Sequence, residues 1–432
     1  MKLYVPDSVR NQHVYIAGKT RHGKSTLIHW SALQDIIQDK AVAVLDPKGD
    51  LVEKLIHFIP KSRIADTIYL DGLAPIPIDF MSWETRTELN QLADDLMVTF
   101  KQLSQNAAGD RWQSILQWTV NTVLEAKSCS FLDIYYFLVS DARRRSILAR
   151  ITNEDILQYW KEQYPHFPKD SATPITTRMA KFLLTPSLKV MLGSADAKLN
   201  VFDVMEKNKV LLVNLAKGGK ESGNLIGTLL VSKFQQAAAR RQGQNLEDRK
   251  PFYLYADEFQ NFQTSAFDVI LSEAGGFQLC LTLAHQFVGQ LDSRIRASVF
   301  GNVSTMFLFR LGHEDAPLFA GEIPSMETEP VWRRSPESGE MEWMSRPLPF
   351  DPAKLTKLPR GRALYRAADG SARFINTPHY PEMPRTPYAE IIKKRTIDDY
   401  GSKAASSVAL SKEDEINPTG RPQNIPPHRN EA

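Results

Sequence analysis

The amino-acid sequence predicts an α/β fold in which a mainly parallel sheet is interrupted by an inserted all-α domain. Short apolar runs alternate with helical stretches over residues 13–80, and the same alternation returns after residue 209. Between these parts, strand signals are scarce and apolar residues recur at helical spacing. Buried strands that alternate with helices are typical of a parallel sheet covered on both faces.

The first part of the sheet domain is expected to span residues 1–83. The apolar runs at 14–17 and 41–45 predict two buried strands, and the segments 24–38 and 51–58 predict the helices that follow them. The all-α domain is expected at 84–194, inserted after the second of these strands. Its apolar stripes, with the three- and four-residue spacing of a helix core, are Leu89, Leu92, Leu96, Met97, Phe100, Trp112, Ile115, Leu116 and Val120.

The second part of the sheet domain is expected at 195–376. Apolar runs at 209–214, 252–256, 278–283 and 305–310 predict four further strands, and 225–241 predicts a helix. Asp369-Gly370 marks the turn of a hairpin within 361–376. The last segment, 377–432, is rich in Pro, Ser, Lys and Glu, so we expect a disordered tail with one short helix at 388–395.

Composition excludes several classes of protein. The 432 residues contain no run of eighteen apolar residues and no signal peptide at the N-terminus. The two cysteines, Cys129 and Cys280, are far apart and lack metal-binding spacing. We therefore expect a protein of a reducing compartment, the cytoplasm. The net charge of +3 neither requires nor excludes a nucleic-acid partner.

A phosphate-binding loop follows the first predicted strand. The sequence GKTRHGKS at 18–25 fits the pattern G-x-x-x-x-G-K-[ST], and it opens a predicted helix. Glycines let successive N–H groups point at phosphates, and the helix N-terminus adds its positive end. Lys24 would reach the β- and γ-phosphates, while Ser25 would bind Mg²⁺. The expected nucleotide contacts are Gly18, Lys19, Thr20, Arg21, His22, Gly23, Lys24, Ser25 and Thr26.

An acidic pair ends a later strand. The sequence FYLYADE at 252–258 places Asp257 and Glu258 directly after an apolar run. Beside a phosphate-binding loop, the first carboxylate is expected to hold Mg²⁺ and the second to orient and deprotonate the attacking water. The sequence therefore predicts an ATPase with ATP and Mg²⁺ as ligands. The N-K-x-D motif of GTPases and the L-S-G-G-Q signature of transport ATPases are both absent from the sequence.

An ordered set of motifs resembles the conjugative coupling ATPases of the TraD and TraG type, with their relatives in the HerA and FtsK group. These are RecA-like motors of the ASCE class, which have a catalytic glutamate and an additional strand between the two nucleotide-binding strands. The motifs are the phosphate-binding loop, DPKGD at 46–50, LYADEFQN at 254–261, LAHQ at 283–286, and FGNVST at 300–305 running into Phe309-Arg310 and EDA at 314–316. Family members usually begin with transmembrane helices, so this chain resembles a soluble branch.

The resemblance implies roles for further residues. Gln286 would sense the γ-phosphate or orient the water, and Arg310 would sense nucleotide or face a neighbouring subunit. Arg310 is expected to close a strand beside the one that ends at Gln286. Many relatives carry an arginine where this chain has Gly275-Gly276, so the charge of an arginine finger must come from elsewhere. For DPKGD, the resemblance implies a place beside the phosphate-binding loop, but it leaves open whether Lys48 or Asp50 touches the nucleotide.

The resemblance also implies a homo-oligomeric ring, a hexamer, that moves DNA in conjugation, type IV secretion or DNA processing with a partner from such machinery. Arg143, Arg144, Arg145 and Arg150, near Tyr135, Tyr136 and Phe137, form a candidate DNA surface or a solvated helix face. Two alternatives remain open. One is an ATPase that moves or unfolds proteins, and the other is a low-turnover module whose assembly ATP switches.

Overall fold

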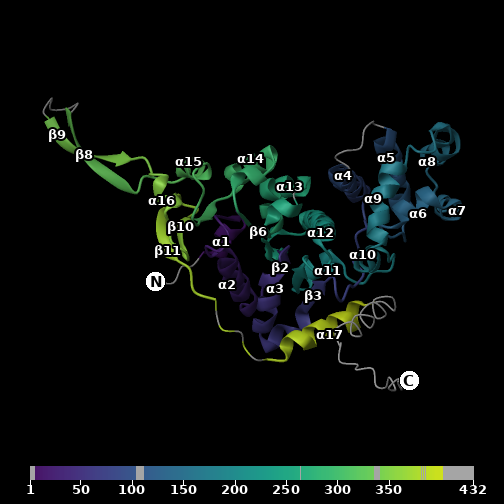
Figure 1. The fold of residues 1–432 in the computed structure, drawn as a ribbon, viewed down its shortest axis with the longest axis horizontal. Helices are drawn as coiled ribbons and strands as arrows, with labels where there is room; N and C mark the ends of the chain where they lie inside the picture. Colours follow the sequence, from purple (N-terminus) through teal and green to yellow (C-terminus); the bar gives the residue numbers. More distant parts are fainter. Residues whose placement is uncertain are drawn as a thin grey trace, which may run out of the picture.

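The computed structural model describes residues 5–103, 111–262, 264–334, 341–380, 382, 384 and 386–401. A nine-stranded sheet forms its centre, with strand order β11-β10-β7-β1-β6-β5-β2-β4-β3. The seven strands from β7 to β3 are parallel, and β10 and β11 add an antiparallel hairpin at one edge. The expected mainly parallel α/β fold is thus confirmed (Figure 1).

The strands and helices follow the sequence pattern closely in the sheet domain. The strands are β1 (Val14–Ala17), β2 (Ala41–Asp46), β3 (Thr67–Asp71), β4 (Val210–Asn214), β5 (Phe252–Ala256), β6 (Leu279–His285), β7 (Thr305–Leu308), β10 (Arg362–Arg366) and β11 (Ala372–Asn376). The helices that connect or cover them are α1 (Asp7–Arg10), α2 (Lys24–Ile37), α3 (Asp50–Leu55), α11 (Val201–Glu206), α12 (Lys220–Arg240), α13 (Ser265–Glu273), α14 (Ser293–Asn302), α15 (Asp315–Ala320), α16 (Ala353–Thr356) and α17 (Tyr388–Tyr400).

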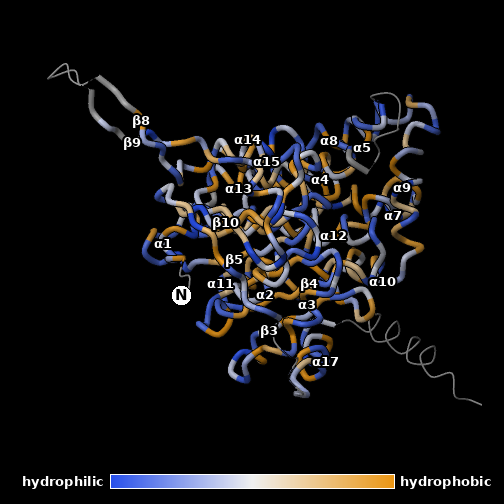
Figure 2. The backbone as a smooth tube through the Cα atoms, turned by 60° about the vertical axis from the view of Figure 1, so that its left-hand side comes forward, coloured by the Kyte–Doolittle hydropathy of each residue, from blue (hydrophilic) through white to orange (hydrophobic). Residues whose placement is uncertain are grey.

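Alternate residues of each strand enter two different cores. In β1, Val14 and Ile16 pack with residues of α2 and α3, while Tyr15 and Ala17 face the side of α12, α13 and α14. Helices therefore cover both faces of the sheet, which is why its seven parallel strands are mainly apolar and are buried along their whole length. In Figure 2 the apolar segments gather in the middle of the molecule, around β4 and β5.

Residues 86–192 are helical over the part of this stretch that the structure describes. The helices are α4 (Arg86–Leu103), α5 (Arg111–Glu125), α6 (Asp133–Val139), α7 (Asp141–Leu148), α8 (Glu154–Gln158), α9 (Thr173–Leu183) and α10 (Pro186–Leu192). They follow β3, a strand that the sequence reading missed, rather than the second strand as expected. A parallel bridge between Ile78 and Leu199 joins the segments on either side of this helical region.

A polar seam joins the helical region to the sheet domain along α4 and α12. Gln236 Nε2 donates to the buried carboxylate of Asp95 at 3.2 Å, and Arg240 forms a two-pronged ion pair with Glu88 at 2.8 and 2.9 Å. The ammonium of Lys233, fully enclosed, donates to the carbonyl of Ser82 at 2.8 Å. Burial raises the pKa of Asp95 to about 6 and lowers the pKa of Lys233 to about 8.

Two segments differ from expectation. The hairpin of β8 (Glu327–Arg334) and β9 (Met341–Leu348), for which no strands were expected, projects from the domain (Figure 1). The short helix expected at 388–395 is present as α17 (Tyr388–Tyr400), but it is longer than expected and packs on the folded chain. Its buried Ala389 and Ile392 pack on the sheet, and Thr396 Oγ1 accepts the N–H of Tyr69 on the edge strand β3 at 3.0 Å. Residues 402–432 lie outside the described residues.

Candidate nucleotide-binding site

The predicted phosphate-binding loop lies between β1 and α2, at the carboxyl edge of the parallel strands. Gly18 and Gly23 have φ angles of +149° and +121°. A Cβ atom on Gly18 would lie 2.6 Å from Cβ of Phe309, and one on Gly23 would lie 2.8 Å from the ring of Phe309. Glycine is therefore required at both positions for backbone conformation and for space. The N–H of Lys19 donates to the carbonyl of Arg310 at 2.8 Å, which fixes the loop to the end of β7.

Lys24 and Ser25 begin α2 and point into this edge. Lys24 is buried, and its Nζ donates to the carbonyls of Gly18 at 2.6 Å and Lys19 at 3.4 Å, so its ammonium folds back over the loop. Burial lowers its pKa. Ser25 Oγ donates to Oδ2 of Asp257 at 2.9 Å. Two motifs that are 232 residues apart in the sequence thus meet through this hydrogen bond.

The acidic pair follows β5, and both carboxylates are buried. The strand order places β6 between β1 and β5, as expected for an additional strand between the two nucleotide-binding strands. Burial, together with the nearby Asp46 and Glu258, raises the pKa of Asp257 to about 6. Glu258 has a φ angle of +46°, an unusual conformation for this residue type that is typical of functional sites.

Several donors converge on the carboxylate of Glu258. Gln286 Nε2 donates to Oε1 at 3.0 Å, Gln260 Nε2 donates to Oε2 at 2.9 Å, and Lys48 forms an ion pair with Oε1. Burial pushes the pKa of Glu258 upward, but these hydrogen bonds and the charge of Lys48 bring it below its ordinary value. The structure thus brings the predicted Glu258 and Gln286 together. It adds Gln260 and Lys48, to which sequence reasoning assigned no role although both lie within the motifs.

Gln286 is held by a histidine that sequence reasoning also missed. His285, at the end of β6, is completely buried, and burial lowers its pKa to about 3. Its Nδ1 lies 3.1 Å from the carbonyl of Phe287, which can only accept, so Nδ1 carries the proton and Nε2 accepts from the hydroxyl of Tyr15. Neutral His285 therefore connects β6 to β1 and fixes the chain on both sides of Gln286.

Arg310 contacts the phosphate-binding loop through its backbone carbonyl, while its side chain bonds to another segment. Its Nε donates to the carbonyl of Thr356 at 2.9 Å, and the residue is exposed. The strand that it follows, β7, pairs with β1 and β10 and not with β6, so the expectation of a place beside the Gln286 strand is wrong. Arg294 and Arg296, on α14, are also exposed. At Gly275, a Cβ would lie 2.6 Å from the carbonyl oxygen of Asn11, whereas a Cβ at Gly276 would meet no atom within 4 Å.

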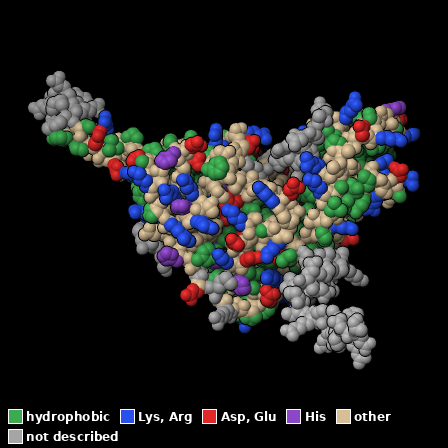
Figure 3. Space-filling view, viewed as in Figure 1, with side chains coloured by type: hydrophobic (Ala, Val, Ile, Leu, Met, Phe, Trp, Pro, Cys, Tyr) green, Lys and Arg blue, Asp and Glu red, His purple; other side chains and the backbone are tan. Residues whose placement is uncertain are grey.

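The arginine cluster of the helical region makes mainly internal contacts. Arg143 pairs with the buried Asp133 at 2.6 Å, Arg144 donates to Asp141 and to two backbone carbonyls, and Arg150 donates to the carbonyl of Lys127. Tyr135 and Tyr136 pack against the core. These contacts favour the interpretation of a structured helix face. Figure 3 shows Lys and Arg side chains gathered over β10 and β11, where Lys357, Arg360, Arg362 and Arg373 are exposed.

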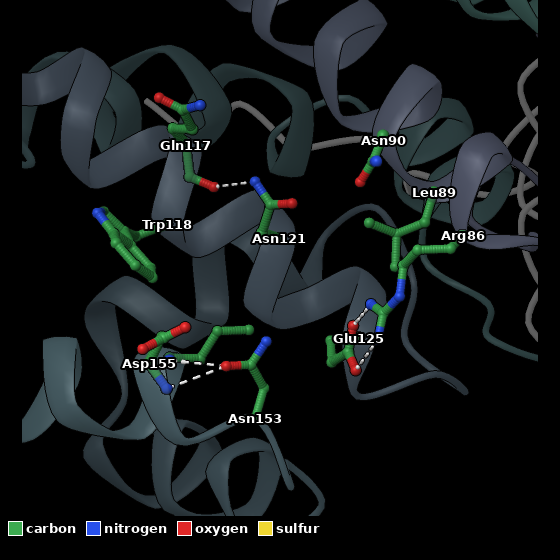
Figure 4. A pocket seen from close by; sticks show the side chains of 10 residues that line it. Arg86, Leu89, Asn90, Gln117, Trp118, Asn121, Glu125, Asn153 and Asp155 are labelled. Atoms are coloured by element: carbon green, nitrogen blue, oxygen red, sulfur yellow. Dashed lines mark hydrogen bonds and ion pairs between the residues drawn. The ribbon is translucent and has the colours of Figure 1, made fainter.

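An open cavity of about 590 Å³ lies among α4, α5 and α8 of the helical region (Figure 4), which Figure 1 shows apart from α2 and the loop before it. Its lining combines amide side chains with the ion pair of Arg86 and Glu125 and the ring of Trp118. The amides are those of Asn90, Gln117, Asn121 and Asn153. Such a lining offers hydrogen bonds to a ligand, but these residues include no nucleophile paired with a base.

Two further observations concern ligands and membranes. Among the residues that the structure describes, no group of three His, Cys, Asp or Glu side chains could hold a metal ion. A Mg²⁺ site built from Ser25 and Asp257 would therefore share its ion with phosphate oxygens, as Mg²⁺ sites commonly do. Across the same described residues, no helix is long and apolar enough to cross a bilayer.

Comparison with solved structures shows which fold this is. The unbound bacterial conjugative coupling protein TrwB matches with a TM-score of 0.62 at 15% identity, over 89% of each chain. TrwB bound to the non-hydrolysable ATP analogue ADPNP matches with a TM-score of 0.61 at 15% identity, over 90% of this chain and 91% of that one. VirB4 of Thermoanaerobacter pseudethanolicus matches with a TM-score of 0.51 at 13% identity, over 88% of this chain and 91% of that one. No family model and no curated protein matches. The chain thus has the RecA-like fold of the coupling ATPases, as the resemblance in its motifs implies.

Proposed function

We propose that this chain is an ATPase that assembles into a ring and couples ATP hydrolysis to the movement of DNA. The observation that carries the ATPase assignment is the convergence of Lys24, Ser25, Asp257, Glu258 and Gln286 at one edge of the sheet. The fold likeness supports it, because TrwB has been solved with ADPNP, with a GTP analogue and with ADP and Mg²⁺.

The residues present fit ATP and Mg²⁺. The N–H groups of the loop and of the first turn of α2 would hold the phosphates, and Lys24 would leave its loop carbonyls for the β- and γ-oxygens. Ser25 and Asp257, already in contact, would hold Mg²⁺. Bound Mg²⁺ neutralises charge on the phosphate oxygens during transfer. Glu258 would accept a proton from the attacking water, and Gln286 would orient that water.

The assignment of DNA as the moved substrate rests on the fold likeness to a conjugative coupling protein. We propose a hexameric ring in the cytoplasm that works with transfer or secretion machinery. In RecA-like motors the nucleotide lies between subunits, so ATP is expected to favour the assembled state. The cavity in the helical region is a candidate binding site for a transferred substrate or a partner, because its amide side chains are suited to hydrogen bonding.

The decisive experiment is the ATPase rate with and without single- and double-stranded DNA, combined with the mass of the protein with ATP and Mg²⁺. We expect DNA to stimulate the rate and nucleotide to increase the mass to that of a ring. Stimulation by unfolded protein but not by DNA would favour the protein-moving alternative. Nucleotide-dependent assembly without turnover would favour the switching module.

A further inference from the structure

The loop between β2 and α3 is built to hold a fixed backbone beside the acidic pair. The buried carboxylate of Asp46 accepts the N–H groups of Lys48 at 3.0 Å, Leu51 at 2.7 Å and Val52 at 3.2 Å. Gly49 has a φ angle of +81°, and a Cβ there would lie 2.5 Å from the side-chain oxygen of Asn214. The position of the Lys48 backbone is therefore fixed, and its movement is limited to the side chain.

The side chain of Lys48 joins this fixed loop to the predicted catalytic base. It is 48% exposed, whereas the Glu258 side chain with which it pairs is 3% exposed. Oε1 of Glu258 also accepts from Gln286, and Oε2 accepts from Gln260. In this arrangement a positive charge and two amide donors occupy the oxygens that would have to accept a proton from water. A carboxylate held this way is a poor general base.

Two lysines stand beside the space that the phosphates would occupy. Lys24 turns back to the carbonyl of Gly18, and Lys48 turns to Glu258, so each ammonium is held by an oxygen of the protein. The γ-phosphate would bring concentrated negative charge close to the carboxylate of Glu258. The flexible, half-exposed lysine stem is suited to exchange one oxygen partner for another.

We propose that Lys48 is a positioning residue that holds Glu258 in the nucleotide-free site and moves to the γ-phosphate when ATP binds, which releases Glu258 to the attacking water. This inference rests on the proposed ATPase function and assigns a role to the DPKGD motif. ADP lacks the γ-phosphate, so with ADP bound Lys48 stays on Glu258. Lys48 therefore distinguishes ATP from ADP at the residue that would activate water.

The test compares the affinities of the full-length protein for ADPNP and for ADP, both with Mg²⁺, by calorimetry. The variants are Lys48→Met, Lys48→Arg and, as a matched control, Lys61→Met, which removes an exposed lysine away from the site. In K48M the γ-phosphate would face Glu258 without an intervening cation. We expect K48M to lose at least about tenfold in its preference for ADPNP over ADP, since a hydrogen bond between charged groups is lost. Its ADP affinity should stay within about twofold of the wild type.

Lys48→Arg should recover most of the preference, because it restores the charge, and Lys61→Met should match the wild type. If Lys48 had a purely structural role, K48M would bind ADPNP and ADP more weakly by the same factor. An unchanged ratio of the two affinities in K48M would therefore overturn the inference. Failure of the wild type to bind either nucleotide would overturn the proposed function itself. If the wild type binds but does not turn over ATP, the motor proposal fails, while a shifted ratio in K48M still supports the role of Lys48.

Discussion

Charged side chains are buried both at the carboxyl edge of the sheet and in the polar seam between α4 and α12, among other places, and these two arrangements differ. In the seam, Arg240 and Glu88 pair through both oxygens, and both side chains are only 12% exposed. At the sheet edge, several donors compete for Glu258, and one of them, Lys48, is half exposed. Burial of charge alone therefore does not mark a reactive site. The sheet edge differs because several donors converge on the single carboxylate of Glu258, and one of them is the half-exposed side chain of Lys48.

The largest effect is expected from Glu258, because it tests whether the sheet edge performs chemistry. Glu258→Gln keeps the size and most hydrogen bonding of the side chain but removes the base, so we expect kcat to fall about 10²–10⁴-fold with ATP affinity retained. Lys24→Ala should instead abolish ATP binding. Steady-state rates and equilibrium binding would separate these outcomes, with the exposed Glu247→Gln as the control. An unchanged rate in the Glu258 variant would exclude it as the base.

Arg310→Ala is expected to retain ATP binding and to lose most of its hydrolysis rate, at least about tenfold, since an arginine near the γ-phosphate contributes up to about 10³–10⁵. The side chain would have to leave the carbonyl of Thr356 to do so. Mixing Arg310→Ala with Lys24→Ala subunits should restore part of the rate if the arginine acts across an interface. No recovery would place its action within one subunit. A rate equal to that of the wild type in Arg310→Ala would discard Arg310, and the exposed Arg294 and Arg296 are the next candidates. Wild-type rates in all three alanine variants would favour the switching module.

In the polar seam, unlike at the sheet edge, removal of a buried charge is expected to stabilise the protein. Because burial raises the pKa of Asp95 to about 6, the folded protein keeps a proton that the unfolded chain releases near pH 4. Stability therefore falls as the pH rises between about 4 and 6. Asp95→Asn should match the wild type near pH 4 and exceed its free energy of unfolding by about 1–3 kcal/mol at pH 7.

Denaturant titrations between pH 4 and 8 would measure this difference, with Asp94→Asn, at an exposed position one residue earlier, as the matched control. A destabilisation of Asp95→Asn that grows as the pH rises would show that the carboxylate is ionised and stabilising in the folded protein. The seam would then resemble the sheet edge more closely than its geometry indicates.

The helix α17 tests apolar packing instead of charge, because none of the charged side chains in Tyr388–Tyr400 is buried. Ile392 is fully buried and Ile391 is 42% exposed, so Ile392→Ala should lower the free energy of unfolding by about 2–4 kcal/mol and Ile391→Ala by much less. Deletion of 402–432 should leave folding and basal ATPase activity unchanged, because the segment has few apolar residues. A large fall in melting temperature on this deletion would show that the segment packs on the folded chain.

The sequence was most informative where local pattern and chemistry coincide. The glycines of the phosphate-binding loop, the strand before Asp257 and the turn at Asp369-Gly370 each predicted an observed feature. The contacts of Lys48, His285 and Gln260 could not be predicted, because they depend on how distant strands pair. The helix expected at 388–395 is present, but its full extent to Tyr400 and its packing on the sheet could not be predicted, because composition does not reveal which surface its few apolar residues cover. The roles of Gln286 and Arg310 stay predictions.

The strand order has a consequence for how the chain acquires its structure during synthesis. The neighbours of β1 in the sheet are β6 and β7, and Ala17 pairs with His285 and Leu308. Ribosomes add about 5–20 residues per second. Roughly 13–54 s therefore pass between the synthesis of β1 and that of β6, its first neighbouring strand to be made. Contacts so distant in sequence also slow folding. The apolar strand Val14–Ala17 is thus exposed to other chains and to chaperones until residue 285 of the 432 has been made.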